Sequence, residues 1–174
     1  MSKLDTQPIS RRTLVLSYGG GAAVFAAGLA ASTPRANAAG ADEHTAYGRL
    51  LDRYLAAVNA HDTSTFPEIF TEAYIQHSGR NPSGLQAQVA NFQRIFENWP
   101  DFQSHIEDRI FGADRIVARV TFSGTHSRTV LGFAPTGKKV TWGAIDIWRV
   151  ENGKLAEHWD IVDVAALQRQ LRGD

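Results

Sequence analysis

Cysteine is absent from the 174-residue sequence, which excludes disulfide bonds and thiol chemistry. An excess of positive charge is also absent, because 18 basic and 18 acidic residues balance. Residues 1–38 hold four of the basic residues and one acidic residue, so the rest of the chain has 14 basic and 17 acidic residues. That remainder has no basic patch, and we therefore expect no nucleic-acid partner.

Two patterns of ligand-binding sites are missing as well. Residues 132–139, GFAPTGKK, lack the glycine spacing of a phosphate-binding loop. The histidines lack the close spacing of metal ligands, so we expect no metal ion. A metal site built from residues far apart in the sequence is the least favoured alternative, and its ligands would be His77, His126, His158 and Asp160.

The N-terminal segment has the pattern of an export signal. SRRTL at residues 10–14 resembles the twin-arginine motif, a Gly/Ala-rich apolar run spans residues 15–31, and residues 36–38 form an A-x-A cleavage site. We predict that residues 1–38 are recognised by the twin-arginine translocase and removed. Residues 39–174 would then form one domain that is periplasmic or secreted and does not contact the membrane. A membrane anchor is the alternative, but the apolar run is short and interrupted by glycines.

The most informative stretch, residues 140–163, reads as two strands joined by a tight turn. If Asn152 and Gly153 alone form the turn, Asp146 faces Trp159, and Asp146 and Asp160 lie on opposite faces. If Glu151 joins them in a three-residue loop, the register slips by one residue and Asp146 pairs with His158. We favour the second register, because this sequence suits a type I turn closed by a glycine bulge.

The favoured register places Asp146, His158 and Asp160 on one face, between Trp142 and Trp148. A carboxyl group buried without a partner among aromatic rings has a raised pKa, and it can then exchange protons near neutral pH. The alternative is that both aspartates are structural and bond to the backbone or to a neighbouring arginine.

Hydrophobic periodicity defines the remaining elements. Helices are predicted over residues 43–59, 66–70, 84–98 and 164–171, with capping boxes that start at Thr65 and Ser83. Strands are predicted over residues 73–77, 102–111 and 115–128. This order gives an α+β fold in which N-terminal helices cover a pocket on a strongly curved antiparallel sheet.

Five short motifs occur in order along the chain: WPD at 99–101, GTH at 124–126, PTGK at 135–138, IDIWR at 145–149 and GKLAEHWD at 153–160. With them, residues 43–171 resemble the SnoaL-like polyketide (ester) cyclases of the nuclear-transport-factor-two-like superfamily. The resemblance implies a cone-shaped α+β barrel. It also implies ring closure by an intramolecular aldol reaction without a metal or an organic cofactor.

The resemblance also implies roles for individual residues. Asp160 matches the general acid/base of the family, and Asp146 matches a polar residue that assists it. His77 and His126 match positions near the pocket. Family members commonly form homodimers through the outer face of the sheet, where this chain would place Trp159 and Ile161.

We therefore expect an exported protein that performs aldol or isomerase-type acid/base chemistry on a small apolar carbonyl substrate. Asp160 would move the proton and Asp146 and His158 would orient it, while Trp142, Trp148 and Phe92 would exclude water. Two alternatives stay open. The same carboxylates could activate water for epoxide or ester hydrolysis, or the pocket could bind a small ligand without catalysis.

Overall fold

The computed structural model describes residues 36–172, with side chains from residue 44 on. The predicted signal peptide lies almost entirely outside this range. In chain order the elements are α1 (Ala36–Asn59), α2 (Phe66–Ile69), β1 (Phe70–Gln76), α3 (Leu85–Asn98), β2 (Gln103–Phe111), β3 (Arg115–Thr125), β4 (Lys139–Glu151), β5 (Lys154–Val162) and α4 (Val164–Arg172). Within residues 36–172, no helix is long and apolar enough to cross a bilayer.

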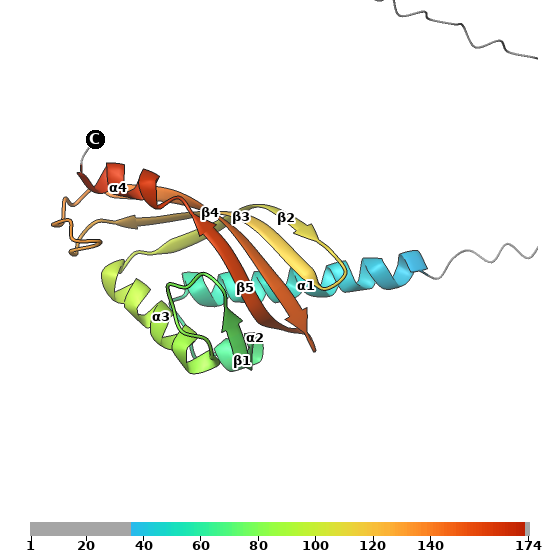
Figure 1. Ribbon diagram of the computed structural model, residues 1–174. Coiled ribbons are helices and arrows are strands. Elements are labelled where there is room, and N and C mark those ends of the chain that lie inside the picture. The colour runs from blue at the N-terminus through green and yellow to red at the C-terminus, as the bar shows by residue number, and fades with distance from the viewer. Residues whose placement is uncertain (1–35, 173–174) are drawn as a thin grey trace, which may run out of the picture. The chain divides into compact units, whose positions relative to one another are not determined.

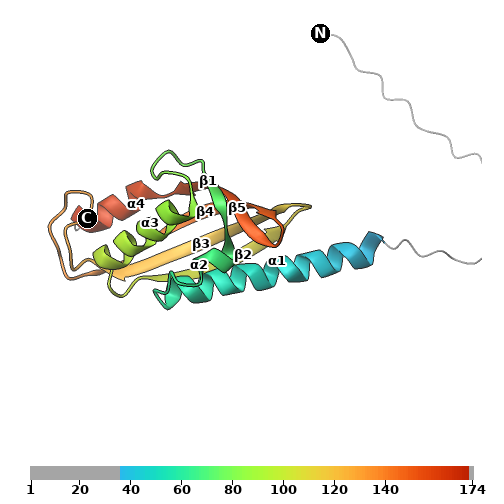
Figure 2. The same cartoon turned by 90° about the horizontal axis from the view of Figure 1, so that it is seen from below.

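The five strands form one sheet in the order β1-β5-β4-β3-β2. The meander from β2 to β5 is antiparallel, as predicted, whereas β1 pairs with β5 in parallel. The sheet is curved, and α1, α2 and α3 lie on its concave side (Figure 1). Seen from below, α1 runs roughly along β3, and α3 lies nearer to α4 (Figure 2). The α+β class is confirmed, but the predicted barrel is not closed, because β1 and β2 remain unpaired edges with helices between them.

The hairpin register differs from both predicted registers. Asp146 pairs with Asp160 and Trp148 pairs with His158. The turn contains only Asn152 and Gly153, whose φ angles of 50° and 73° fit a type I′ turn. A β-bulge follows, because Val150 pairs with Leu155 while the next pair along is Arg149 with Glu157.

The predicted face is nevertheless correct. The extra residue is Ala156, and it lies in the strand rather than in the turn. One inserted residue turns the rest of β5 to the other face wherever it is placed. Consecutive burial of Leu155 and Ala156 marks the position of the bulge. Asp146, His158 and Asp160 therefore share the concave face even though their predicted pairing was wrong.

The helices start differently from the two predicted capping boxes. Neither Thr65, the N-cap of α2, nor Gly84, the N-cap of α3, makes a side-chain capping hydrogen bond. The hydroxyl of Ser83 instead accepts a hydrogen bond from the backbone N–H of Gln76, at 3.1 Å. Ser83 thus ties the loop before α3 to the end of β1. At the last helix, the Asp163 carboxylate accepts from the N–H of Ala166, so the predicted cap is confirmed.

One close contact shapes the end of the sheet next to α3. A Cβ atom on Gly124 would lie 2.9 Å from Cε3 of Trp99. Only glycine therefore allows β3 to pass behind this indole ring without displacing it. The contact holds Trp99 against Trp142, with the ring centroids 5.0 Å apart.

Candidate functional site

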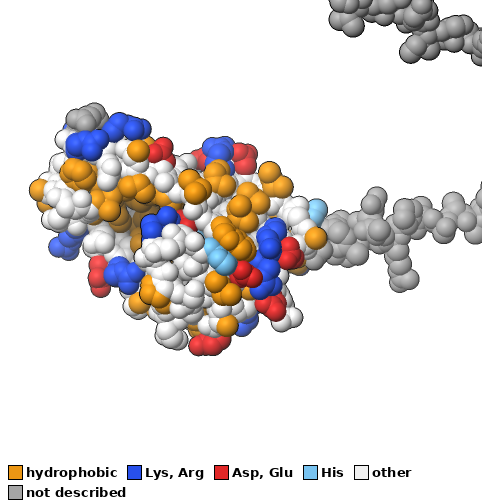
Figure 3. Space-filling view, in the orientation of Figure 1, with side chains coloured by type: hydrophobic (Ala, Val, Ile, Leu, Met, Phe, Trp, Pro, Cys, Tyr) orange, Lys and Arg blue, Asp and Glu red, His pale blue; other side chains and the backbone are white. Residues whose placement is uncertain are grey.

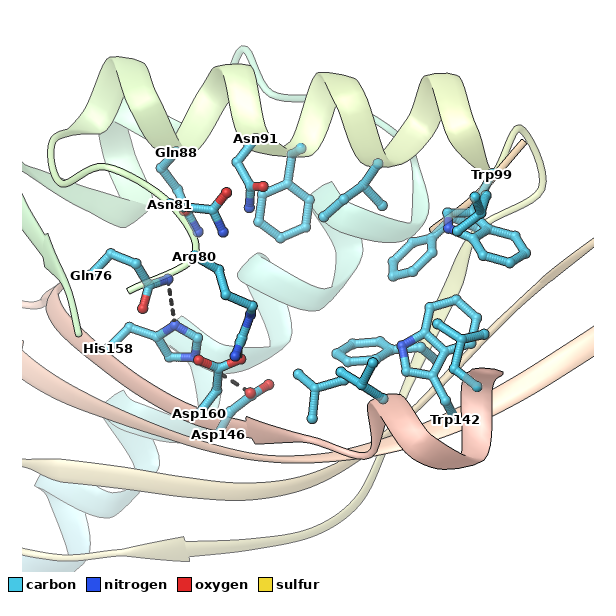
Figure 4. A pocket seen from close by; sticks show the side chains of 18 of the residues that line it. Gln76, Arg80, Asn81, Gln88, Asn91, Trp99, Trp142, Asp146, His158 and Asp160 are labelled. Atoms are coloured by element: carbon cyan, nitrogen blue, oxygen red, sulfur yellow. Dashed lines mark hydrogen bonds and ion pairs between the residues drawn. The ribbon is translucent and has the colours of Figure 1, made fainter. Parts of the chain in front are cut away.

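A cavity of about 330 Å³ lies between α3 and the concave face of β4 and β5. Figure 4 shows labelled polar side chains gathered at one end, and Trp99 and Trp142 at the other. On the molecular surface a hollow lined by hydrophobic side chains carries charged groups of both signs at its rim (Figure 3). The cavity can therefore hold a compound with an apolar body and one polar end.

The floor of the polar end is formed by Asp146 and Asp160, which face each other across β4 and β5. Side chains that face each other in this way are close enough to interact, and two carboxylates repel. Arg80 contacts Asp160 as a counter-charge, and Nε2 of His158 lies 3.4 Å from Oδ1 of Asp146. The predicted catalytic residues are thus brought together in the cavity.

Arg80 is a site residue that the sequence analysis missed. Its guanidinium donates a hydrogen bond to Oδ2 of Asp160, although 80 residues separate the two in the sequence. The Asp160 side chain is only 7% exposed, whereas that of Arg80 is 47% exposed. Oδ1 of Asp160 is buried and has no hydrogen-bond partner in the part of the chain that the structure describes. The carboxylate is therefore held by one oxygen, while the hydrogen-bonding capacity of the other is unused among the described residues.

Gln76 determines how His158 presents its proton. The carbonyl Oε1 of Gln76 accepts from the backbone N–H of Ser78, at 3.2 Å. Its amide nitrogen must therefore be the group 2.9 Å from Nδ1 of His158, and it donates to that nitrogen. Nδ1 is then the acceptor, and Nε2 carries the proton 3.4 Å from Oδ1 of Asp146. This chain of contacts points Nε2 of His158 toward the Asp146 carboxylate, although the two do not form a hydrogen bond among the described residues.

Tyr54 was predicted only as part of the apolar stripe of α1, and it lines the cavity. Burial raises the pKa of Tyr54 well above its usual value, and the nearby carboxylates of Asp146 and Asp160 raise it further. The hydroxyl therefore stays protonated and can donate a hydrogen bond. No local pattern distinguishes Tyr54 from its core neighbours, so its sequence position gave no signal of this role.

The roof of the polar end carries three amide side chains, Asn81, Gln88 and Asn91. Gln88 is 5% exposed, and its Oε1 has no hydrogen-bond partner among residues 36–172. A buried acceptor without a partner costs free energy unless a ligand or water occupies it. The roof can thus bind polar groups of a ligand opposite the carboxylates.

The apolar end contains two of the predicted substrate-binding residues, Phe92 and Trp142. Its other apolar lining residues are Ile95, Trp99, Phe102, Phe122, Val130, Leu131, Val162, Val164 and Leu167. Leu167 comes from α4, so the last helix closes this end of the cavity. These side chains exclude water from most of the cavity wall.

Three predicted binding residues lie outside the cavity wall. Trp148 is fully buried beneath His158, with the rings stacked 5.2 Å apart, so it supports the site from behind. His126 is buried on the far side of Trp99 and its Nδ1 lies 3.1 Å from the hydroxyl of Thr136. Its place at the end of β3, behind the indole ring, keeps it from the ligand.

His77 was also predicted to bind the substrate, and the structure contradicts this. Its ring stacks on Trp159, at 4.3 Å, and its Nε2 lies 2.8 Å from Oε2 of Glu157. Glu157 and Trp159 alternate with the cavity residues along β5, so His77 lies against the opposite face of the sheet. The four side chains of the metal alternative therefore do not converge, and the described part of the chain holds no cluster of three potential metal ligands.

Comparisons with known proteins agree with this geometry. The family model of the SnoaL-like polyketide cyclases matches residues 48–171. TsrD from Streptomyces laurentii is 30% identical, covers 73% of this chain and 95% of its own, and has a TM-score of 0.68. AclR from Streptomyces galilaeus is 26% identical with a TM-score of 0.65, covering 72% of this chain and 83% of its own.

IdmH from Streptomyces antibioticus is 24% identical, covers 72% of this chain and 97% of its own, and shares the fold with a TM-score of 0.65. No curated protein matches the sequence. The family model spans the sheet, α3 and the whole cavity floor. The chain therefore belongs to the SnoaL-like polyketide cyclase family.

Proposed function

We propose that the protein catalyses proton transfer at a carbon next to a carbonyl group, leading to aldol ring closure or isomerisation of a small, mainly apolar compound. The observation that carries this proposal is the Asp160 carboxylate. It lines a largely apolar cavity, is held by Arg80 through one oxygen, and has its other oxygen buried without a partner. A carboxylate placed in this way can accept a proton from a bound substrate.

The cavity suggests how the substrate is oriented. Its apolar body would lie between Phe92 and Trp142, which leaves its carbonyl group at the polar end. Asp160 would remove the proton and later return it to carbon or oxygen. Asp146 would be a positioning residue, since it faces Asp160 across the two strands and lies 3.4 Å from Nε2 of His158.

The alternative of a non-catalytic carrier is less well supported. A carrier of apolar ligands gains nothing from two buried carboxylates, because each loses hydration on burial. Asp146 and Asp160 both line this cavity, and Gln76 orients the His158 ring so that its Nε2 lies 3.4 Å from Asp146. Such an arrangement is more typical of acid/base chemistry than of simple binding.

Export by the twin-arginine translocase remains part of this proposal, as does a homodimer formed through the outer face of the sheet. The outer face offers Ile145 and Ile161, which are exposed to solvent in the single chain. Exposed apolar groups of this size are typical of association surfaces.

Deuterium exchange tests the proposed chemistry. The full protein is incubated in D₂O with a panel of aryl ketones and 1,3-dicarbonyl compounds small enough for the cavity. Exchange at the carbon next to the carbonyl is followed by proton NMR. We expect exchange to be accelerated by the wild type and lost in D160N. An Asn variant with full exchange activity would contradict the assignment of Asp160.

A further inference from the structure

We propose that Arg80, Asn81 and Asn91 form an oxyanion-binding site above Asp160, and that the substrate is therefore a neutral carbonyl compound that becomes an enolate in the site. The inference rests on the proposed proton transfer and adds the group that receives the negative charge. Nothing in the chemistry of Asp160 alone requires such a group. It follows from the donors that surround the carboxylate.

Arg80 is the first of these donors. It is the one positively charged side chain among the described residues that line the cavity. It bonds one oxygen of Asp160 while its own side chain remains about half exposed, so part of its guanidinium is uncovered. A guanidinium has five N–H donors and can bind two oxygen-bearing partners at once.

Arg94 makes Asn81 and Asn91 donors toward the cavity. Its Nη2 donates to Oδ1 of Asn81, at 3.1 Å, and to Oδ1 of Asn91, at 3.3 Å. These two bonds fix the orientation of both amides, because the oxygen atoms must face Arg94. The amino group of each amide is thereby left for the cavity that both side chains line. In Figure 4, Asn81 and Asn91 lie on the α3 side of the cavity, whereas Arg80 extends across it to Asp160.

The net charge of the polar end stays the same throughout the reaction, and only its position changes. Before proton transfer the polar end holds the guanidinium of Arg80 and the carboxylates of Asp146 and Asp160. The C–H bond breaks, its proton moves to Asp160, and its electron pair forms a C=C bond while the carbonyl π pair moves to oxygen. One negative charge has thus moved from Asp160 to the substrate.

The guanidinium of Arg80 can move its hydrogen bond from Asp160 to the new enolate oxygen while it stays at the polar end. The attraction to the enolate exists only after the proton has moved, so it stabilises the transition state more than the bound substrate. A substrate that arrives as a carboxylate would instead add a third anion beside Asp146 and Asp160. The site therefore favours neutral carbonyl compounds over carboxylic acids.

A stable phenolate can stand in for the enolate in a binding test. The probe is 4-nitrophenol, whose neutral and ionised forms have separate absorbance bands, at a pH where half of the free probe is ionised. Asp160→Asn mimics the protonated carboxyl group. We expect D160N to bind the phenolate at least about tenfold more tightly than the wild type, in which Asp160 occupies Arg80.

Further variants assign the effect to the proposed donors. Adding Arg80→Gln to D160N should abolish the tenfold gain, and adding Asn91→Leu should weaken binding about fivefold. Arg119→Gln, added to D160N, is the matched control, because Arg119 is an exposed arginine paired with Asp108 away from the cavity. It should leave binding unchanged. Circular dichroism checks that each variant is folded.

Binding of neutral nitrophenol by D160N, or equal phenolate binding with and without Arg80, would overturn the oxyanion site. If D160N/R80Q does not fold, the test rests on D160N alone. Binding of the phenolate form supports the oxyanion site, and binding of the neutral form contradicts it. Loss of deuterium exchange in D160N combined with no phenolate preference would leave the proposed function standing and remove only this inference. Full exchange in D160N would remove the proposed function itself.

Discussion

The two faces of the β4–β5 hairpin carry the same kinds of side chain in different states. On the outer face, Glu157 accepts from Nε of Arg149, at 2.5 Å, and contacts Nε2 of His77, at 2.8 Å. These hydrogen bonds, the one from His77 first, lower the pKa of Glu157. On the inner face, Asp160 is held by Arg80 at one oxygen and leaves the other without a partner.

The comparison separates a structural carboxylate from the one that we propose to be reactive. Glu157 lies three residues before Asp160 on the same strand, so strand alternation places the two carboxylates on opposite faces. Each has an arginine partner, Arg149 for Glu157 and Arg80 for Asp160. What differs is that the outer carboxylate has all its strong partners while the inner one has a buried atom without a partner. That atom is what a substrate could use.

The largest expected effect is the difference between Asp160→Asn and Glu157→Gln. D160N should lower the rate of proton transfer by ~10²–10⁴-fold, because a positioned carboxylate base is lost. E157Q should leave the rate within about twofold, because its effect is confined to the outer face. Deuterium exchange with the same carbonyl panel measures both rates. Equal losses in the two variants would mean that the faces do not differ in the proposed way.

The second effect concerns Trp148 and Trp159, which lie on opposite faces of the hairpin. Trp148 is 1% exposed and packs edge-on against Tyr54 at 5.5 Å, so Trp148→Ala should destabilise the fold by about 3–5 kcal/mol. Trp159 lies on the outer face beneath His77 and near Arg115, and Trp159→Ala should cost only about 1 kcal/mol. Urea unfolding midpoints measure both costs. Comparable losses of unfolding free energy in the two variants would show that the Trp159 ring is buried in the functional protein.

The third effect tests the proposed association of the outer face. Ile161 is 78% exposed, and Ile161→Asp places a charge in the middle of this surface. If the homodimer forms there, the dissociation constant should rise by at least about tenfold, since interface centres tolerate buried charge poorly. Analytical ultracentrifugation measures it, and proton-transfer rates per chain serve as a control. A wild type that is monomeric at high concentration would contradict the proposed dimer.

The smallest effect is the dependence of stability on alkaline pH. Burial raises the pKa values of Tyr54 and Tyr74 above the usual value of 10.0. In the unfolded chain both ionise near pH ~10, whereas in the folded chain they keep their protons. Stability should therefore fall as the pH rises above about 10, since the unfolded state then binds fewer protons.

Replacing either tyrosine with phenylalanine should reduce this alkaline loss relative to the wild type. Urea titrations at neutral pH and near pH ~11 measure it, and the difference between the two values removes the ordinary cost of the substitution. An alkaline loss that is unchanged in both variants would show that these hydroxyl groups do not drive it.

Much of the fold followed from periodicity and turn chemistry. Alternation along residues 140–163 identified both strands and the face that carries Asp146 and Asp160. The exact pairing could not be predicted, because an extra residue at Ala156 has the same effect on strand faces as an extra residue in the turn. The burial of two consecutive side chains, which marks the bulge, is known only from the folded structure.

The site was predicted less completely than the fold. Asp146, His158 and Asp160 could be found because they alternate with apolar residues on one hairpin. Arg80 and Gln76 could not, since they reach the cavity through a loop and an edge strand that are remote in the sequence. His77 was misassigned for a related reason. Nothing in its neighbourhood predicts that β1 joins β5 in parallel, which places this histidine over Trp159.

The contact between Gly124 and Trp99 bears on the size of molecule that the protein accepts. Gly124 does not line the cavity, but it packs against the indole ring of Trp99, which lines the apolar end of the cavity. Any larger residue there would push the ring inward and shorten the space for a ligand. The residue at position 124 can thus set the length of ligand that the cavity accepts. It does so from outside the pocket, without touching the bound molecule.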